Sequence, residues 1–100
     1  MDKKLLQFMG LCQRAGKLAS GETGVLSAIK DGSAELIIVA ENASDNTKKK
    51  FGDSARFYNK KIVVFGDKFE MGNAIGKDQR AVMAVRDTGS ADKREKMIAE

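Results

Sequence analysis

Hydrophobic positions along the chain change their spacing several times, and each change predicts a new element. The first stretch has apolar residues at i, i+3, i+4 and i+7, which predicts a helix with one buried stripe made of Leu5, Phe8, Met9 and Cys12. Gly16 ends this helix, and a short strand over 17–19 follows. A second helix is then predicted from Ser20, a good capping residue, to Asp31 and Gly32, with a buried face of Val25, Leu26, Ala28 and Ile29.

The spacing then changes from helical to continuous. Residues 36–40 are an unbroken apolar run, which predicts a strand buried on both faces. Residues 43–45 open a third helix with an apolar side of Phe51, Ala55 and Tyr58, and 62–65 form a second buried strand that ends at Gly66.

The last third of the chain repeats the alternation. Asp67, with Glu70 three residues later, resembles a capping box and starts a short helix that buries Met71, Ala74 and Ile75. A last strand is predicted over 81–85, and Ser90 caps an amphipathic tail. Alternating helices and strands predict a three-layer α/β/α sandwich, in which 1–100 is a single domain without a linker or a repeat.

Composition excludes several classes of protein. The chain has 100 residues, of which 42% are hydrophobic and 32% charged, so a disordered protein is excluded. Because there is no His and a single Cys, a His/Cys zinc site, a catalytic triad and an intrachain disulfide are all ruled out. The absence of an export signal or a membrane-spanning run predicts a cytoplasmic protein. The net charge of +4 permits a polyanionic partner without requiring one.

Two motifs that resemble catalytic or nucleotide-binding sites have simpler interpretations. Residues 72–77 resemble a phosphate-binding loop, but the spacing of Gly72 and Gly76 is one residue short and Asp78 follows Lys77. The glycine at 76 is therefore expected to end a helix. The carboxylate pairs of the chain fit solvated helix caps better than acid–base catalysis, so no enzymatic activity is predicted.

Polar and basic residues gather at the predicted junctions between strands and helices. Lys48, Lys49 and Lys50 lie in the first turns of the third helix, where a solvated helix face is the ordinary interpretation. If the main strands are mostly parallel, however, several junctions meet at one end of the sheet, where α/β folds bind ligands. Helix N-termini with free N–H groups suit phosphates and base edges. Aromatic stacking platforms are scarce.

The junction residues carry a resemblance to a known family. Five segments carry it, in the same order and at the same spacing: residues 15–18, 20–22, 28–32, 34–44 and 71–77. They resemble the ribosomal protein L7Ae/L30e superfamily. Within that superfamily, they resemble the small bacterial YlxQ-like branch. This resemblance implies an α/β/α sandwich around a four-stranded mixed sheet, RNA binding with kink-turns as the best-known target, no catalysis and no cofactor.

The chain departs from the family pattern at the base-reading positions. In kink-turn binders an Asn-Glu pair and a Lys one turn later read the sheared G·A pairs, and Thr23, Gly24 and Ser27 occupy these positions here. The loop after the fourth helix, apolar in the family, is replaced by residues 77–80. RNA binding is therefore expected to be retained, with altered kink-turn specificity.

We accordingly expect a cytoplasmic, translation-associated RNA-binding protein that is a monomer, binds structured or ribosomal RNA or the ribosome, and has no metal and no membrane partner. Base or sugar edges would be met by Gly21, Glu22, Thr23 and Ser27, near Glu41 and Asn42. Phosphates would be met by Lys17, Lys48, Lys49, Lys77 and Arg80. The alternative is a protein-interaction module, which would show scattered positive charge and an exposed apolar patch.

Overall fold

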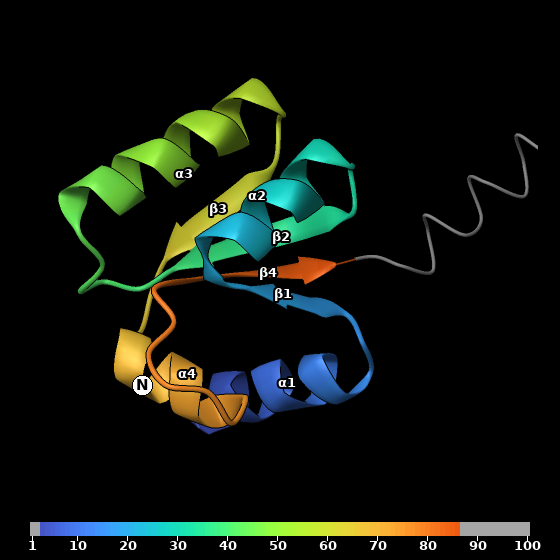
Figure 1. Ribbon diagram of the computed structural model, residues 1–100, viewed down its shortest axis with the longest axis vertical. Coiled ribbons are helices and arrows are strands. Elements are labelled where there is room, and N and C mark those ends of the chain that lie inside the picture. Colours follow the sequence, from blue (N-terminus) through green and yellow to red (C-terminus); the bar gives the residue numbers. More distant parts are fainter. Residues whose placement is uncertain (1–2, 87–100) are drawn as a thin grey trace, which may run out of the picture.

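The computed structural model describes residues 3–86, which form four helices and four strands in three layers (Figure 1). Along the chain these are α1 (Lys3–Arg14), β1 (Leu18–Ser20), α2 (Gly21–Lys30), β2 (Ala34–Val39), α3 (Asp45–Phe57), β3 (Lys61–Val64), α4 (Lys68–Ala74) and β4 (Val82–Arg86). The expected alternation of elements is confirmed. The tail predicted to begin at Ser90 lies outside the described residues.

The sheet is mixed and has the strand order β1-β4-β2-β3. Only β2 and β3 are parallel, with Ile37 opposite Ile62, whereas β4 is antiparallel to both β1 and β2. The last described strand thus lies in the middle of the sheet. The assumption that the main strands are mostly parallel is therefore wrong, and the grouping of the junctions has a different origin.

Helices cover both faces of the sheet, as expected for an α/β/α sandwich. In Figure 1, α1 and α4 lie together on one side, and α2 and α3 lie on the other. The β-branched run of β2 supplies the centre of the core, where Ile37, Ile38 and Val39 are at most 1% exposed. Met9 from α1, Ile29 from α2, Phe51 from α3 and Met71 from α4 are fully buried against it.

Side-chain caps begin two of the four helices. The Ser44 hydroxyl accepts a hydrogen bond from the N–H of Thr47 at the start of α3. Asp67 accepts from the N–H groups of Phe69 and Glu70 at the start of α4, so the predicted capping role of Asp67 is confirmed. Gly76, at φ +71°, follows the end of α4, which confirms that it ends a helix rather than forming a phosphate loop.

The structure corrects three predictions of burial. Phe8 is 45% exposed and Tyr58 is 38% exposed, so neither belongs to the core assigned to it. The strand predicted to be buried at 62–65 is instead the edge strand β3, where Val63 and Val64 are exposed, as is Phe65 directly after it. A continuous apolar run predicts a strand, but it does not distinguish a central position from an edge.

Candidate functional site

Three helix N-termini meet around one groove on the surface. The groove has a volume of about 480 Å³. We call it the N-terminal groove, because the first residues of α2, α3 and α4 and the loop before β4 surround it. It is lined by Ser20, Gly21, Glu22, Thr23, Gly24, Ala43, Ser44, Thr47, Lys68, Gln79, Arg80, Ala81 and Val82.

The start of α2 is open to this groove. Gly21 begins the helix with φ +80°, a conformation that favours glycine. Ser20 occupies the predicted N-cap position, but its side chain makes no capping hydrogen bond. The first-turn N–H groups therefore have no side-chain cap, and they carry the partial positive charge of the helix end. This end of α2 can donate hydrogen bonds to an anionic or carbonyl oxygen.

Two basic residues reach the groove from the opposite wall. The N–H of Arg80 donates to the carbonyl oxygen of Lys68 (2.9 Å), which joins the loop to the start of α4. The guanidinium of Arg80 donates to the carbonyl oxygen of Gln79 (2.8 Å). A Cβ built on Gly21 would lie 4.0 Å from Cδ of Arg80, so Arg80 extends to the start of α2. The groove consequently combines two cations with uncapped backbone donors.

Gly72 fixes the position of the loop that carries Arg80. A Cβ built on Gly72 would lie 1.5 Å from the carbonyl oxygen of Asp78, so the loop backbone rests directly on α4. The N–H of Lys77 also donates to the carbonyl oxygen of Gly72 (2.9 Å). No other residue type fits at this contact without moving the loop.

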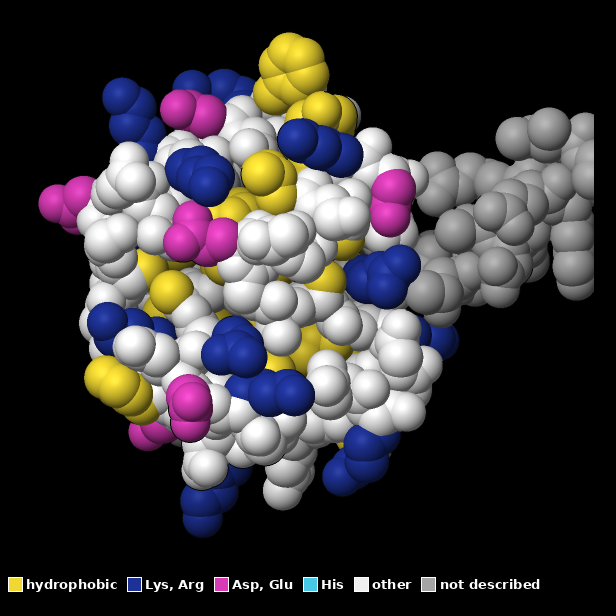
Figure 2. Space-filling model, in the orientation of Figure 1, with side chains coloured by type: hydrophobic (Ala, Val, Ile, Leu, Met, Phe, Trp, Pro, Cys, Tyr) yellow, Lys and Arg dark blue, Asp and Glu magenta, His cyan; other side chains and the backbone are white. Residues whose placement is uncertain are grey.

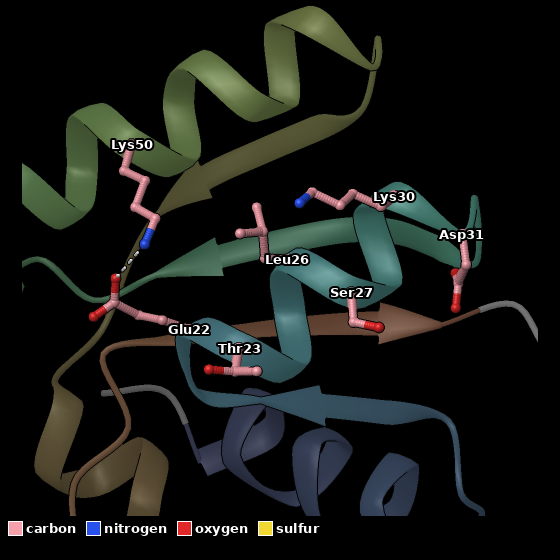
Figure 3. Close-up of a pocket in the computed structure, with 7 residues that line it drawn as sticks. All are labelled: Glu22, Thr23, Leu26, Ser27, Lys30, Asp31 and Lys50. Atoms are coloured by element: carbon pink, nitrogen blue, oxygen red, sulfur yellow. Dashed lines mark hydrogen bonds and ion pairs between the residues drawn. The ribbon is translucent and has the colours of Figure 1, made fainter.

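A second hollow separates α2 from α3. Nζ of Lys50 lies 3.4 Å from a carboxylate oxygen of Glu22, and this ion pair crosses from one helix to the other (Figure 3). Thr23 and Ser27 lie one turn apart on α2, and both are exposed. Lys30 and Asp31 also line this hollow, so two cations and two carboxylates surround it.

Glu41 and Asn42 hold a turn together. The N–H of Glu41 donates to the carbonyl oxygen of Gly66 (2.8 Å). The Asn42 side chain donates to Asp67 (2.9 Å) and accepts from the N–H of Lys68 (2.9 Å), so both ends of its amide are occupied at the start of α4. Asn42 is exposed, and its side chain holds the backbone of Lys68 at the start of α4.

The structure brings some of the predicted site residues together and leaves others apart. Gly21, Glu22, Thr23 and Arg80 line the N-terminal groove, and Ser27 lines the adjoining α2–α3 hollow. Four predicted phosphate contacts do not line the groove: Lys17, Lys48, Lys49 and Lys77. Lys17 precedes β1, whereas Gly21 follows it, so the strand separates them.

The sequence reasoning missed three groove residues that lie at helix starts. Ser44, Thr47 and Lys68 line the groove but are not among the site residues predicted from the sequence. The available signal was the recurrence of Ser and Asp caps before α3 and α4, which marks helix N-termini. That signal does not reveal that the helix starts converge, because convergence depends on the strand order.

Charge is distributed over the visible face rather than gathered on it. Figure 2 shows Lys and Arg side chains spread across this face, with Asp and Glu among them. The scattered charge on this face and the exposed apolar residues of β3 form the pattern expected of a protein-interaction module.

Within residues 3–86, two titratable groups have shifted pKa values, and both lie outside the groove. Burial raises the pKa of the Cys12 thiol, and the nearby charge of Lys17 opposes this shift. Hydrogen bonds from Ser33 lower the pKa of Asp31, whose Oδ1 accepts from the N–H of Ser33 at 2.8 Å. Cys12 is thus a buried core thiol, as its place on the apolar stripe predicted, and Asp31 stabilises the turn after α2.

The fold and the groove define a small mixed-sheet α/β protein with a polar, cationic groove at converging helix N-termini. Residues 3–95 match the ribosomal protein L7Ae/L30e/S12e/Gadd45 family, and the chain belongs to this family. No helix within residues 3–86 is long and apolar enough to cross a membrane.

Relatives of known sequence and structure support this assignment. The chain is 39% identical over 86 residues to the RNA-binding protein YlxQ of Bacillus subtilis, covering 86% of each chain. It is 35% identical to the RNA-binding protein YlxQ of Enterococcus faecium, covering 96% of this chain and 92% of that one. A Bacillus halodurans protein of unknown function has a similar structure, with a TM-score of 0.80, 36% identity and coverage of 99% and 100%. The 15.5kD RNA binding protein of Giardia lamblia shares the fold, with a TM-score of 0.73, 20% identity and coverage of 89% and 76%.

Proposed function

We propose that this chain is a non-catalytic, single-domain RNA-binding protein that works in the cytoplasm with structured RNA of the translation machinery. The observation that carries the proposal is the N-terminal groove, where the uncapped start of α2 faces Lys68 and Arg80. The names of the YlxQ relatives describe RNA-binding proteins, and the groove provides the donors that such binding requires.

The groove offers two kinds of donor to RNA. Lys68 and Arg80 supply charge for phosphate oxygens, which dominate the affinity for nucleic acid and make it depend on salt. The first-turn N–H groups of α2 can meet a base-edge or sugar oxygen, which fixes orientation. The hydroxyls of Ser44 and Thr47, joined by a 2.9 Å hydrogen bond, provide further polar contacts at the start of α3.

A bent RNA fits this arrangement better than an extended single strand. The donors converge from three helix starts and one loop, whereas stacking binders need a row of exposed aromatic rings over a groove. The exposed rings of Phe57 and Tyr58 pack against each other, edge to face, at the far end of α3. We infer that a kink-turn or a similarly bent RNA is the ligand, read mainly through its backbone because Thr23, Gly24 and Ser27 lack the family's charged side chains.

A titration of the full chain with a kink-turn RNA tests this proposal. The logarithm of the affinity should fall with the logarithm of salt concentration with a slope of roughly −2 to −4, from about three to five phosphate contacts. Lys68→Ala and Arg80→Ala should each weaken binding and reduce the slope by about one. Arg14→Ala, an exposed change at the end of α1, is the matched control and should leave binding unchanged. Binding that does not respond to salt or to these variants would refute the proposal.

A further inference from the structure

The edge strand β3 exposes apolar side chains where soluble proteins usually place charges. Val63 is 43% exposed, Val64 52% and Phe65 40%, and these three residues are consecutive. In the described part of the chain, β3 pairs with β2 on one side and with no strand on the other. Unpaired edges are ordinarily protected by charges, proline or bulges, because they readily pair with another strand. The only charge within β3 is Lys61, at its first position.

Charge is arranged oppositely at the two ends of this strand. Lys61 is exposed at the beginning of β3. At its other end, a hollow of about 290 Å³ is lined by Phe65 and Gly66 together with the acidic residues Glu41, Asp67 and Glu70. The hydrogen bond from the N–H of Glu41 to the carbonyl oxygen of Gly66 holds this carboxylate beside the strand end. The strand is thus basic where it starts and acidic just after it finishes.

We propose that β3 is a self-association edge, where a second copy of this chain adds its own β3 in the antiparallel direction. In a two-fold pair centred on Val63, this valine lies opposite its counterpart, a favourable β-branched cross-strand pair. Lys61 of each copy then lies opposite Phe65 of the other, next to the acidic hollow of that copy. The interface is isologous, so it buries the apolar run twice and places each Lys61 near the acidic hollow of the other copy.

The length of β3 sets the strength of this contact. The four residues of β3 span about 13 Å at about 3.3 Å each, so the pairing is short and the interface is small. Such an interface belongs to the weak, transient class. Its exposed charge pairs are screened by salt, so association should be strongest at low ionic strength.

Sedimentation of the full chain over a concentration series tests the proposal. We expect a weight-average mass that rises above 10.9 kDa toward twice that value as concentration increases, and that falls back when salt is added. Val64→Lys should abolish the rise. Phe57→Lys is the matched control, because Phe57 is 81% exposed at the end of α3 and away from β3. Circular dichroism of each variant confirms that the fold is intact.

Charge exchange makes the test specific for the antiparallel geometry. Lys61→Glu makes both ends of the strand acidic, whereas Glu41→Lys places a positive charge at the acidic end. Each variant alone should therefore associate more weakly than the natural chain. An equimolar mixture of the two should recover association, because each supplies the charge that the other lacks. A monomer at every concentration, as expected from the sequence, or self-association that is unaffected by the β3 variants, would overturn the proposal.

Discussion

The N–H of Arg80 donates a hydrogen bond to the carbonyl oxygen of Lys68 over 2.9 Å, joining the two basic residues that line the N-terminal groove. Because the bond is between backbone groups, the fold fixes the two backbone positions from which these side chains extend. Asn42 adds to this framework by accepting from the N–H of Lys68. The cationic wall of the groove is therefore largely preorganised before any ligand arrives.

Gly72→Ala should damage both stability and the groove. The added Cβ would collide with the backbone of Asp78, and overpacking of this kind typically costs about 1–3 kcal/mol. Moving the loop to relieve the collision would displace Arg80, so RNA affinity should fall as well. Gly52→Ala in α3 is the control, since a Cβ there meets nothing within 4 Å and should stabilise the helix by up to about 1 kcal/mol. Urea denaturation of both variants distinguishes the two outcomes, and equal stability would refute the close contact.

Glu22→Gln should strengthen RNA binding. The natural carboxylate neutralises Lys50 across the α2–α3 hollow, and its removal frees one cation for phosphate. We expect a log–log salt slope steeper by about one. Stability should change by less than about 1 kcal/mol, because exposed ion pairs contribute little. Asp53→Asn, which breaks the exposed pair with Arg56, is the control and should leave the slope unchanged. A loss of affinity in Glu22→Gln would show that this carboxylate contacts RNA directly, as first expected from the sequence.

Restoring the family's base-reading side chains should sharpen specificity. The substitutions Thr23→Asn, Gly24→Glu and Ser27→Lys together should create a preference for a kink-turn over the same RNA with altered G·A pairs. Each good base-edge contact contributes about 1–3 kcal/mol of discrimination. One new contact should therefore change the ratio of the two RNA affinities roughly tenfold. Titration of the natural chain and the triple variant against both RNAs gives the answer. Strong discrimination by the natural chain would mean that backbone groups already read the pairs.

Asp31 should make the folded state sensitive to acid. Its pKa is lowered in the folded state by hydrogen bonds from Ser33, so its stabilising effect is present above the ordinary value of 3.8. This contribution is lost as the pH falls through the lowered pKa, where the carboxylate is protonated. Asp31→Asn should therefore flatten the dependence of unfolding free energy on pH below about 4. Denaturation curves at several acidic pH values measure this, and parallel curves for both proteins would contradict it.

The positions of the elements could be predicted from local patterns. The stripe containing Met9 and Cys12, the β-branched run of β2 and the cap at Asp67 each depend on a few neighbouring residues, and all three appear in the structure. Phe8 was assigned to the wrong side because it satisfies the helical spacing of α1 while lying at the margin of the stripe. Local spacing does not measure how wide the buried stripe is.

The groove required information that no local pattern contains. Lys68 and Gly24 are far apart in sequence and line the same groove only because β4 inserts between β1 and β2 and brings the helix starts together. The same limitation explains the error at β3. Its apolar residues suit a buried strand, and only the strand order reveals that one side is an edge. The family resemblance supplied the overall fold, whereas the side-chain roles of Asn42 and Lys50 came from the structure.

The central position of β4 has a consequence for folding during synthesis on the ribosome. The strand that pairs with both β1 and β2 ends at Arg86, so the sheet stays divided until residue 86 has been synthesised. The loop carrying Arg80 immediately precedes this strand and is positioned by the same closure. A nascent chain consequently has no finished groove until this last described strand has been made and has paired with its neighbours.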